Sequence, residues 1–339
     1  MKRVIILCGG ASSEHEISCI SAGALMKAID RTRFEPVLVG ITKSGQWVIP
    51  ASEQVLEIVD GVLPEIKSGS ARTISQVIDE VKPDVVFPIL HGPYGEDGTI
   101  QGLLEVAGIR YVGSGVLASA VAMDKSFAKP IFNAHGLKVA PGMVIHQRDW
   151  HGSISTGYLR YPLFVKPARG GSSRGTTKVK SAEHLAAAID EALTFDTKVM
   201  IEEAIVGREI ECAVLESEGS IHASPLGEIV IDPRFEFYDF EAKYLDGSTH
   251  IELPNDLPSD EIRSAAIRAF SALGCEGLAR VDFFYTEAGE LIINEINTMP
   301  GFTSTSVFPK LWSSAGKSYT DLISALIDTA LARSNHVTR

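Results

Sequence analysis

The stretch RVDFFYTEAGELIINEIN (residues 280–297) decides the fold. Apolar residues fill both of its arms and residues 287–290 supply turn chemistry between them, so the pattern predicts a β-hairpin. Side chains alternate faces along a strand, which places Glu295 and Asn297 on one face, with Asp282 able to lie across from them. Two carboxylates and an amide oxygen suit Mg²⁺, which completes its shell with water and substrate phosphates. The stretch therefore predicts a metal site for a nucleoside triphosphate, and the alternative is a solvated strand face.

A second informative stretch is KPARGGSSRGTT (residues 166–177), which lies between two strand-like runs. Such a Gly- and Ser-rich loop can fold its backbone N–H groups over phosphates, and Lys166 is the candidate cation. It is not a Walker A loop, because neither a Lys-Ser/Thr pair nor a helix follows its last glycine. Residues 171–175 also match G-x-S-x-G with Ser173 as nucleophile, but that hydrolase motif needs a following helix and Thr176 to Val179 looks like a strand. A plain hairpin loop is the remaining alternative.

The composition describes a globular protein of two or three domains. The chain has 339 residues, of which 45% are hydrophobic, enough for more than one core. A net charge of -12 and the lack of a basic run argue against nucleic acid or a membrane surface as partner. No apolar stretch approaches the roughly 20 residues that span a bilayer. The short apolar run that begins at Val4 predicts a first strand rather than a signal peptide.

The cysteines indicate neither a zinc site nor a disulfide framework. They are far apart and form no CxxC or Cys/His cluster: Cys8, Cys19, Cys212 and Cys275. We therefore expect a cytoplasmic protein.

The first third of the chain alternates strand-like and helix-like segments. Ser13 and Glu16 fit a capping box at the start of the first helix. A βαβ series predicts a mostly parallel sheet that binds ligands beyond the carboxyl ends of its strands. The expected elements are strands at 4–8, 34–41 and 85–89, a helix from about 17 to 28, and a helix at 101–107.

The rest of the chain predicts two further units. The first begins with a helix over 124–135, which Pro130 should start or kink. The expected strands are 163–166, 176–179, 199–203, 209–215 and 221–231, with a polar loop at 232–248 and helices at 182–193, 260–273 and 319–332.

Three polar segments flank these elements. Residues 299–306 directly follow the metal strand and offer N–H and O–H donors for a carboxylate or an oxyanion. Residues 91–99 form a polar turn after a strand, in which His91 is either a site residue or a structural loop histidine. Glu14 is either a favourable charge for the helix dipole or a ligand for a substrate ammonium. The residues alone leave these alternatives open.

Together these segments resemble the D-alanine:D-alanine ligases of the ATP-grasp superfamily, over nearly the whole chain. The resemblance implies an α/β protein, with a Rossmann-like N-terminal domain (1–118) followed by a two-lobed α+β ATP-grasp module. The module would comprise a central lobe (119–204) and a C-terminal lobe with the metal and substrate site (205–339). The motifs that carry the resemblance are Gly9-Gly10 with 13–18, His91-Gly92 with 95–98, Met123-Asp124-Lys125, Lys166-Pro167 with 171–173, and residues 241–244, 280–282 and 294–301.

The resemblance implies ATP with two Mg²⁺ ions, which Mn²⁺ can replace. Lys125 and Lys166 would hold the phosphates, and Glu202 and Glu209 the adenine and ribose. The implied metal ligands are Asp282, Glu295 and Asn297, and the implied further nucleotide contacts are Ser173, Glu203, Lys243 and Phe284.

The amino-acid site is implied in the same way. Glu14 would bind the ammonium of the first D-alanine, with Ser172 and Tyr244 hydrogen-bonded to it to close the site. Arg280 and the N–H of Gly301 would stabilise the oxyanion. The remaining implied substrate contacts are His91, Ser306, which would take the carboxylate of the second D-alanine, and Val307.

The implied reaction is ATP-dependent ligation of two D-alanines through a D-alanyl phosphate, for peptidoglycan precursors, in a cytoplasmic homodimer. Gly170 departs from the family, where many relatives carry a larger residue, which concerns loop stiffness more than the reaction.

Three alternatives remain. A non-catalytic nucleotide-binding module would not need Arg280, Gly301 and Ser306 beside its metal residues. A Rossmann dehydrogenase would need a G-x-G-x-x-G run after the first strand, which is absent. A ligase that uses D-lactate, D-serine or another amino acid as acceptor is the main rival, although Tyr244 favours the dipeptide because lactate-accepting relatives replace the tyrosine-bearing lid.

Overall fold

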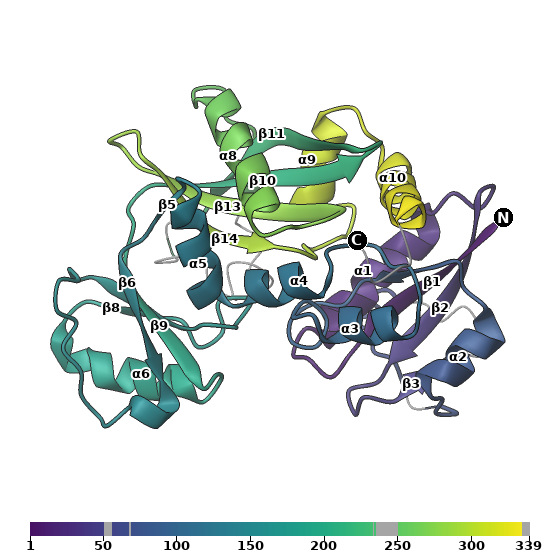
Figure 1. Ribbon diagram of the computed structural model, residues 1–339, viewed down its shortest axis with the longest axis horizontal. Helices are drawn as coiled ribbons and strands as arrows, with labels where there is room; N and C mark the ends of the chain where they lie inside the picture. The colour runs from purple at the N-terminus through teal and green to yellow at the C-terminus, as the bar shows by residue number, and fades with distance from the viewer. Residues whose placement is uncertain (51–55, 68, 233, 235–249, 334–339) are drawn as a thin grey trace.

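A computed structural model describes residues 1–50, 56–67, 69–232, 234 and 250–333. It arranges them around three β-sheets (Figure 1). The chain is therefore the expected mixed α/β protein. None of the described helices is long and apolar enough to cross a bilayer, and all four cysteines are buried and free.

The N-terminal sheet has the strand order β3-β2-β1-β4. The central strand β1 pairs in parallel with β2 and β4, and β3 pairs antiparallel to β2. The predicted mostly parallel sheet is confirmed, and the loops after β1 and β4 leave from the same edge. The elements of this unit are β1 (Lys2–Gly9), α1 (His15–Ala28), β2 (Phe34–Ile41), β3 (Trp47–Val48), α2 (Ile74–Val81), β4 (Val85–Pro88) and α3 (Thr99–Val106).

The capping box expected at the first helix is wrong. Glu14 occupies the N-cap position of α1, and no side chain makes a capping hydrogen bond there. Glu16 instead forms an ion pair with Lys43 at 2.5 Å. A complete capping box is formed at α2, between Thr73 and Gln76.

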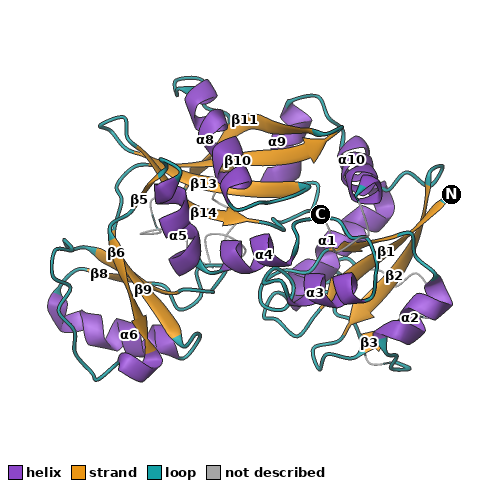
Figure 2. Cartoon of the chain, viewed as in Figure 1, coloured by secondary structure: helices purple, strands orange, loops and turns teal. Residues whose placement is uncertain are grey.

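The middle sheet has the order β6-β9-β7-β8 and is antiparallel throughout. Helix α6 lies along one face of it (Figure 2). The loop at residues 168–176 joins β7 to β8, so a strand follows it and the nucleophile-elbow alternative is excluded. The elements are β6 (Gly142–His146), a short 3-10 helix (Gln147–Asp149), β7 (Leu163–Pro167), β8 (Thr177–Val179), a second 3-10 helix (Ala182–His184), α6 (Leu185–Leu193) and β9 (Lys198–Glu203).

The third sheet has the order β12-β11-β10-β13-β14-β5. Alternate residues of β10 divide between two cores: Cys212 and Val214 face α4, α5 and α8, while Ala213 and Leu215 face α9 and α10. The elements are β5 (Lys138–Val139), β10 (Arg208–Ser217), β11 (Ser220–Val230), β12 (His250–Glu252), β13 (Leu278–Tyr285), β14 (Leu291–Asn297), α4 (Val116–Met123), α5 (Lys125–Ala134), α8 (Ser259–Ala272), α9 (Val307–Ser314) and α10 (Tyr319–Ala332). Helix α5 begins at Lys125 and continues through Pro130, so the helix does not start at the proline.

The first and third units share one hydrophobic core. Phe302, which follows β14, is fully buried and its ring lies 5.6 Å from that of Phe87 on β4, 5.9 Å from Phe308 and 5.7 Å from Tyr319. Residues of β1, β4, α1, α9 and α10 belong to the same cluster. The middle sheet packs with α6 in a cluster of its own, and Figure 1 shows this lobe set apart from the other two units.

Truncation inside the shared core should lower stability strongly. We expect Leu326→Ala, on α10 and 1% exposed, to lower the free energy of unfolding by about 2–5 kcal/mol, because the cavity cannot close fully. The matched Leu63→Ala, at a 44% exposed position, should change it by no more than about 0.5 kcal/mol. Denaturant titrations followed by circular dichroism measure both, and equal losses would contradict the proposed role of the core.

Candidate active site

The site is built on neighbouring strands of the third sheet. In the antiparallel register of β13 and β14, Asp282 lies opposite Glu295 and Arg280 lies opposite Asn297. The Nδ2 of Asn297 donates to Oδ2 of Asp282 at 3.0 Å. The predicted hairpin is therefore confirmed, and its polar side chains gather at the end of the hairpin away from the turn.

Glu211 on β10 extends this row to a third strand. It is the register partner of Asp282, and like charges opposite one another destabilise a sheet. Arg280 offsets them, since its Nε lies 2.7 Å from Oδ1 of Asp282 and 3.0 Å from Oε2 of Glu211. Burial acts to lower the pKa of Arg280, but Asp282 and Glu211 outweigh it and raise the pKa above its usual range. Sequence analysis missed Glu211, although its spacing from Glu209 on a predicted strand put both on one face.

The donor set fits a magnesium ion. Asp282 and Glu295 offer carboxylate oxygens and Asn297 an amide oxygen, which are the hard ligands that Mg²⁺ takes. The described part of the chain has no group of three His, Cys, Asp or Glu side chains placed to hold a metal. A metal at this row therefore depends on the amide of Asn297, as the sequence pattern indicated.

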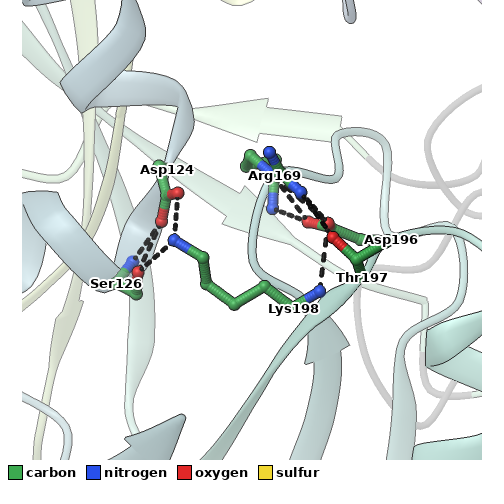
Figure 3. A network of polar contacts seen from close by, with 6 residues as sticks. All are labelled: Asp124, Ser126, Arg169, Asp196, Thr197 and Lys198. Carbon is green, nitrogen blue, oxygen red and sulfur yellow. Dashed lines mark hydrogen bonds and ion pairs between the residues drawn. The ribbon is translucent and has the colours of Figure 1, made fainter. Parts of the chain in front are cut away.

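Lys125 brings a cation to the same row from helix α5. Its Nζ lies 2.9 Å from Oε2 of Glu295 and donates to the carbonyl of Gly170 at 2.8 Å. Asp124 fixes the start of the helix, because it accepts from the backbone N–H of Ser126 at 3.1 Å. Figure 3 shows that Asp124 is in turn held by Lys198 of β9, at 2.5 Å. The Met-Asp-Lys motif thus aims a lysine at the metal row.

Lys166 and Lys129 meet on one carboxylate. Glu202 of β9 is 3% exposed, and its two oxygens lie 2.6 Å from Nζ of Lys166 and 2.5 Å from Nζ of Lys129. Burial opposes ionisation of Glu202, but the two lysines outweigh it and lower its pKa to about 2. Burial lowers the pKa of Lys129 to about 8, against the attraction of Glu202. Sequence analysis missed Lys129, which stands one helical turn after Lys125.

The Gly- and Ser-rich loop is held in an unusual conformation. Ser172 and Ser173 have φ angles of 51° and 56°, a left-handed region that costs a non-glycine residue roughly 1–3 kcal/mol. The hydroxyl of Ser172 donates to Oε1 of Glu14. A side chain at Gly92 would place its Cβ 2.5 Å from the other oxygen of Glu14. The loop from the middle lobe therefore closes onto the N-terminal unit at a carboxylate.

One cavity lies beside Glu14. It is lined by the polar turn after β4 and by the segment that follows β14: His91, Glu96, Asn297, Gly301, Ser306 and Val307. Ser306 is the N-cap of α9, and its Oγ accepts from the N–H of Thr303 at 3.1 Å. A Cβ at Gly301 would lie 3.2 Å from this oxygen, so a glycine leaves the hydroxyl of Ser306 accessible from the cavity. Hydroxyl and N–H groups here can receive a carboxylate.

His91 is a neutral, fully bonded ring. Its Nδ1 lies 3.1 Å from the carbonyl oxygen of Met299, so Nδ1 carries the proton, and its Nε2 lies 3.2 Å from Oγ of Ser21. Burial lowers the pKa of His91, although Glu14 acts in the opposite direction. The ring thus joins Ser21 of the first unit to Met299 of the third unit and holds this wall of the cavity in place.

The carboxyl of Glu96 was missed by sequence reasoning. Its Oε1 accepts from the N–H of Gly92 at 2.7 Å. Burial, followed by the nearby charge of Glu14, raises the pKa of Glu96 to about 8, against the opposing effects of Gly92 and Arg280. The sequence places Glu96 in the polar turn at residues 91–99, but it does not show that its carboxyl group is buried, because burial depends on the fold.

Another cavity lies between the middle and third sheets. It holds most of the expected nucleotide residues: Lys125, Lys166, Ser173, Glu202, Glu203, Glu209 and Phe284. Glu209 and Phe284 are register partners on β10 and β13. Glu203 also binds Arg160 at 2.8 Å. Lys243 and Tyr244 lie outside the described residues.

The two cavities share a wall. It consists of Lys125, Arg280, Glu211, Glu295 and residues 170–172. Cations and carboxylates therefore concentrate at the point where a ligand in one cavity can meet a ligand in the other. Such a wall can stabilise charge that passes between two bound molecules.

Two family models match the chain. The model described as "D-ala D-ala ligase N-terminus" covers residues 3–114, and "D-ala D-ala ligase C-terminus" covers residues 131–328. The D-alanine--D-alanine ligase of Paenarthrobacter aurescens is 50% identical, over 98% of this chain and 95% of that protein. The enzyme of that name from Mycobacterium tuberculosis is 47% identical, over 98% and 96%.

Solved structures give the same picture. The VanG D-Ala:D-Ser ligase from Enterococcus faecalis superposes with a TM-score of 0.79 at 34% identity, over 97% of this chain and 99% of that one. The D-alanine--D-alanine ligase from Bacillus anthracis in complex with ATP superposes with a TM-score of 0.77 at 27% identity, over 98% of both chains.

The stability of the folded chain should depend on whether Glu96 is protonated. In the folded chain the pKa of Glu96 is raised to about 8, whereas the unfolded chain releases this proton near its ordinary pKa of 4.5. The folded state therefore loses stability as the pH rises from about 4.5 to 8. Glu96→Gln removes this effect, so its melting temperature relative to wild type should be several degrees higher at pH 8 than at pH 5. Exposed Glu287→Gln is the control. A difference independent of pH would refute the assignment.

Proposed function

The chain belongs to the D-alanine–D-alanine ligase family, and on that premise we propose how its residues divide the reaction between them. It joins two D-alanines to D-alanyl-D-alanine for peptidoglycan precursors, with conversion of ATP to ADP and phosphate. The observation that carries our division of roles is the charged wall shared by the two cavities.

We assign the nucleotide to the cavity between the middle and third sheets. Apolar side chains such as Phe164, Ile205 and Phe284 line this cavity and suit a flat base. Lys125 and Lys166, the latter at its middle-sheet wall, would bind phosphates, and the remaining proposed contacts are Ser173, Glu202, Glu203, Glu209 and Lys243. A solved ligase with the same fold was crystallised in complex with ATP, which supports ATP as the nucleotide of this chain.

We assign Mg²⁺ to Asp282, Glu295 and Asn297, with two ions as the working stoichiometry. When bound, magnesium supplies positive charge that neutralises the phosphates and the developing charge of phosphoryl transfer. Lys125 and Arg280 now occupy the carboxylates of Glu295 and Asp282, so they would be released toward phosphate when the ions bind.

We assign the two amino acids to the cavity beside Glu14. Glu14 would bind the ammonium of the first D-alanine, in a pocket whose wall is fixed by His91. Ser306, Val307 and the N–H of Gly301 would receive the second. Ser172 already donates to Glu14, which supports a role of the loop in closing this pocket, and Tyr244 is proposed to join it.

The chemistry requires activation before ligation. A carboxylate is a poor acylating agent because its leaving group would be oxide, so the carboxylate of the first D-alanine takes the γ-phosphoryl group of ATP. Lys125, Lys166 and Arg280 hold the charge on the transferring group, which is mainly a task of positioning. The amine of the second D-alanine then attacks the acyl phosphate, and phosphate leaves. Arg280 and Gly301 would stabilise the oxyanion, and the loop at 170–175 keeps out water.

The likeness to a D-Ala:D-Ser ligase keeps D-serine as a second candidate acceptor. The curated relatives at 47–50% identity are D-alanine--D-alanine ligases, so we propose the dipeptide as main product. Both acceptors are amino acids, and neither requires a change at Glu14.

We also propose a cytoplasmic homodimer. Val106 and Leu117 are 92% and 75% exposed on the adjoining helices α3 and α4, and exposed apolar patches mark interaction sites. We propose functional units at 1–118, 119–204 and 205–339. Helix α4 spans the boundary between the first two of these units and α5 lies in the second, but both helices pack in the core of the third sheet rather than with the middle sheet.

Metal dependence tests the carboxylate row. Glu295→Gln should lower kcat by about 100-fold or more at saturating ATP, because charge stabilisation of the transferring group is lost. The variant should stay folded at the assay temperature, with a melting temperature lowered by the loss of the Lys125 ion pair. Glu290→Gln, in the turn of the same hairpin and far from the row, is the matched control. If Glu295→Gln retained wild-type turnover at limiting Mg²⁺, the metal assignment would be wrong.

Acceptor choice tests the reaction. ADP release should depend on D-alanine, and a panel of D-alanine, D-serine, D-lactate and L-alanine should give D-alanyl-D-alanine as the main product at pH 7. Mass spectrometry identifies each product. ADP release that does not respond to D-alanine would refute the ligase assignment, and a dominant D-alanyl-D-serine product would move the chain to the second candidate.

A further inference from the structure

Lys129 is a buried lysine for which the reaction described above has no use. It is 5% exposed on α5 and lines the nucleotide cavity. Its Nζ lies 2.5 Å from Glu202, whose other oxygen lies 2.6 Å from Nζ of Lys166. One buried carboxylate thus holds two cations, the buried Lys129 and the partly buried Lys166, where one would neutralise it.

The second cation has a physical consequence. If Lys166 binds phosphate, it must weaken its hold on Glu202, and removal of the partner of a buried charge is strongly unfavourable. Lys129 remains beside Glu202 when Lys166 turns away. A chain with Lys166 alone would keep that lysine on the carboxylate.

We propose that Lys129 is a positioning residue for nucleotide binding: it is the permanent counter-ion of Glu202 and thereby releases Lys166 to the phosphates of ATP. This inference rests on the proposed phosphate role of Lys166. It adds that the availability of Lys166 is set by a residue that itself contacts no phosphate.

The primary test is Lys129→Met, which keeps the length of the side chain and removes its charge. We expect the KM for ATP and the calorimetric Kd for ADP to rise about tenfold or more, since an interaction with a charged ligand is lost, while the KM for D-alanine changes less than about twofold. Lys129→Arg should retain most of the affinity if the guanidinium is accommodated.

The second test is a double mutant with Glu202→Gln. In that background no carboxylate holds Lys166, and Glu202→Gln alone measures the loss of Glu202 as a proposed nucleotide contact. Lys129→Met should therefore cost less ADP affinity in the Glu202→Gln background than in the wild-type background. This dependence on Glu202 is not expected if Lys129 only supports the fold. The coupling is read from the four variants as a double-mutant cycle.

The chain offers a matched control for the loss of a buried ion pair. Lys198 of β9 pairs with Asp124 at the start of α5, also at 2.5 Å (Figure 3), so both pairs join the same helix to the same strand. Lys198 does not line the nucleotide cavity. Lys198→Met should lower the melting temperature as Lys129→Met does. Because Lys198 acts on Lys125 only through Asp124, which is also bonded to Ser126, its loss of nucleotide affinity should be clearly smaller than that of Lys129→Met.

The outcomes separate the proposals. Equal nucleotide losses in Lys129→Met and Lys198→Met, or the same loss from Lys129→Met with and without Glu202→Gln, would overturn the inference and leave the ligase function intact. Unchanged ADP affinity in Lys166→Ala would overturn the phosphate role on which it rests. Wild-type protein without D-alanine-dependent ADP release would refute the function itself.

Discussion

Compensation of buried charge is the constraint on which the site depends. The third sheet brings three carboxylates into one row, and the middle lobe adds a fourth in Glu202. Charges in such places are tolerated only when they are paired and hydrogen-bonded. Three of the proposed ligand contacts are accordingly paired with a charge of opposite sign: Lys125 with Glu295, Arg280 with Asp282 and Lys166 with Glu202.

This pairing is backed by a second layer of charged residues. Glu211 and Lys129 lie behind the ligand-facing pairs and hold Arg280 and Glu202 from the other side. If ATP and metal ions took the places of Lys125, Arg280 and Lys166 as proposed, Glu211 and Lys129 would still compensate the charges of Arg280 and Glu202. The backbone of Ser172 and Ser173 shows the same preparation, because strain is accepted where the loop must meet Glu14.

Sequence reasoning recovered the parts that local patterns encode. Period-two alternation located Glu295 and Asn297 on one face, and apolar runs located β1, β2 and α10. It missed α4, α9 and the short strands β3, β5, β6 and β12, since short or uniformly apolar segments carry a weak periodic signal. It also missed α2, although the capping box at Thr73 and an amphipathic pattern mark this helix in the sequence. The capping box at Ser13 failed because Glu14 takes the cap position. Lys129, Glu96 and Glu211 were missed because their roles arise from burial and from pairing between segments far apart in the chain.

The separate core of the middle lobe has a mechanical consequence. The contacts described here that join this lobe to the rest of the molecule are polar: Lys129 with Glu202, Lys198 with Asp124, and Ser172 with Glu14. The contact between the first and third units is instead an aromatic cluster around Phe302. Water can replace a hydrogen bond or an ion pair at modest free energy, but it cannot replace packed rings. The molecule thus has one seam that solvent can wet and another that it cannot. The cavity between the middle and third sheets lies along the first seam, and the cavity beside Glu14 lies where residues of all three units meet.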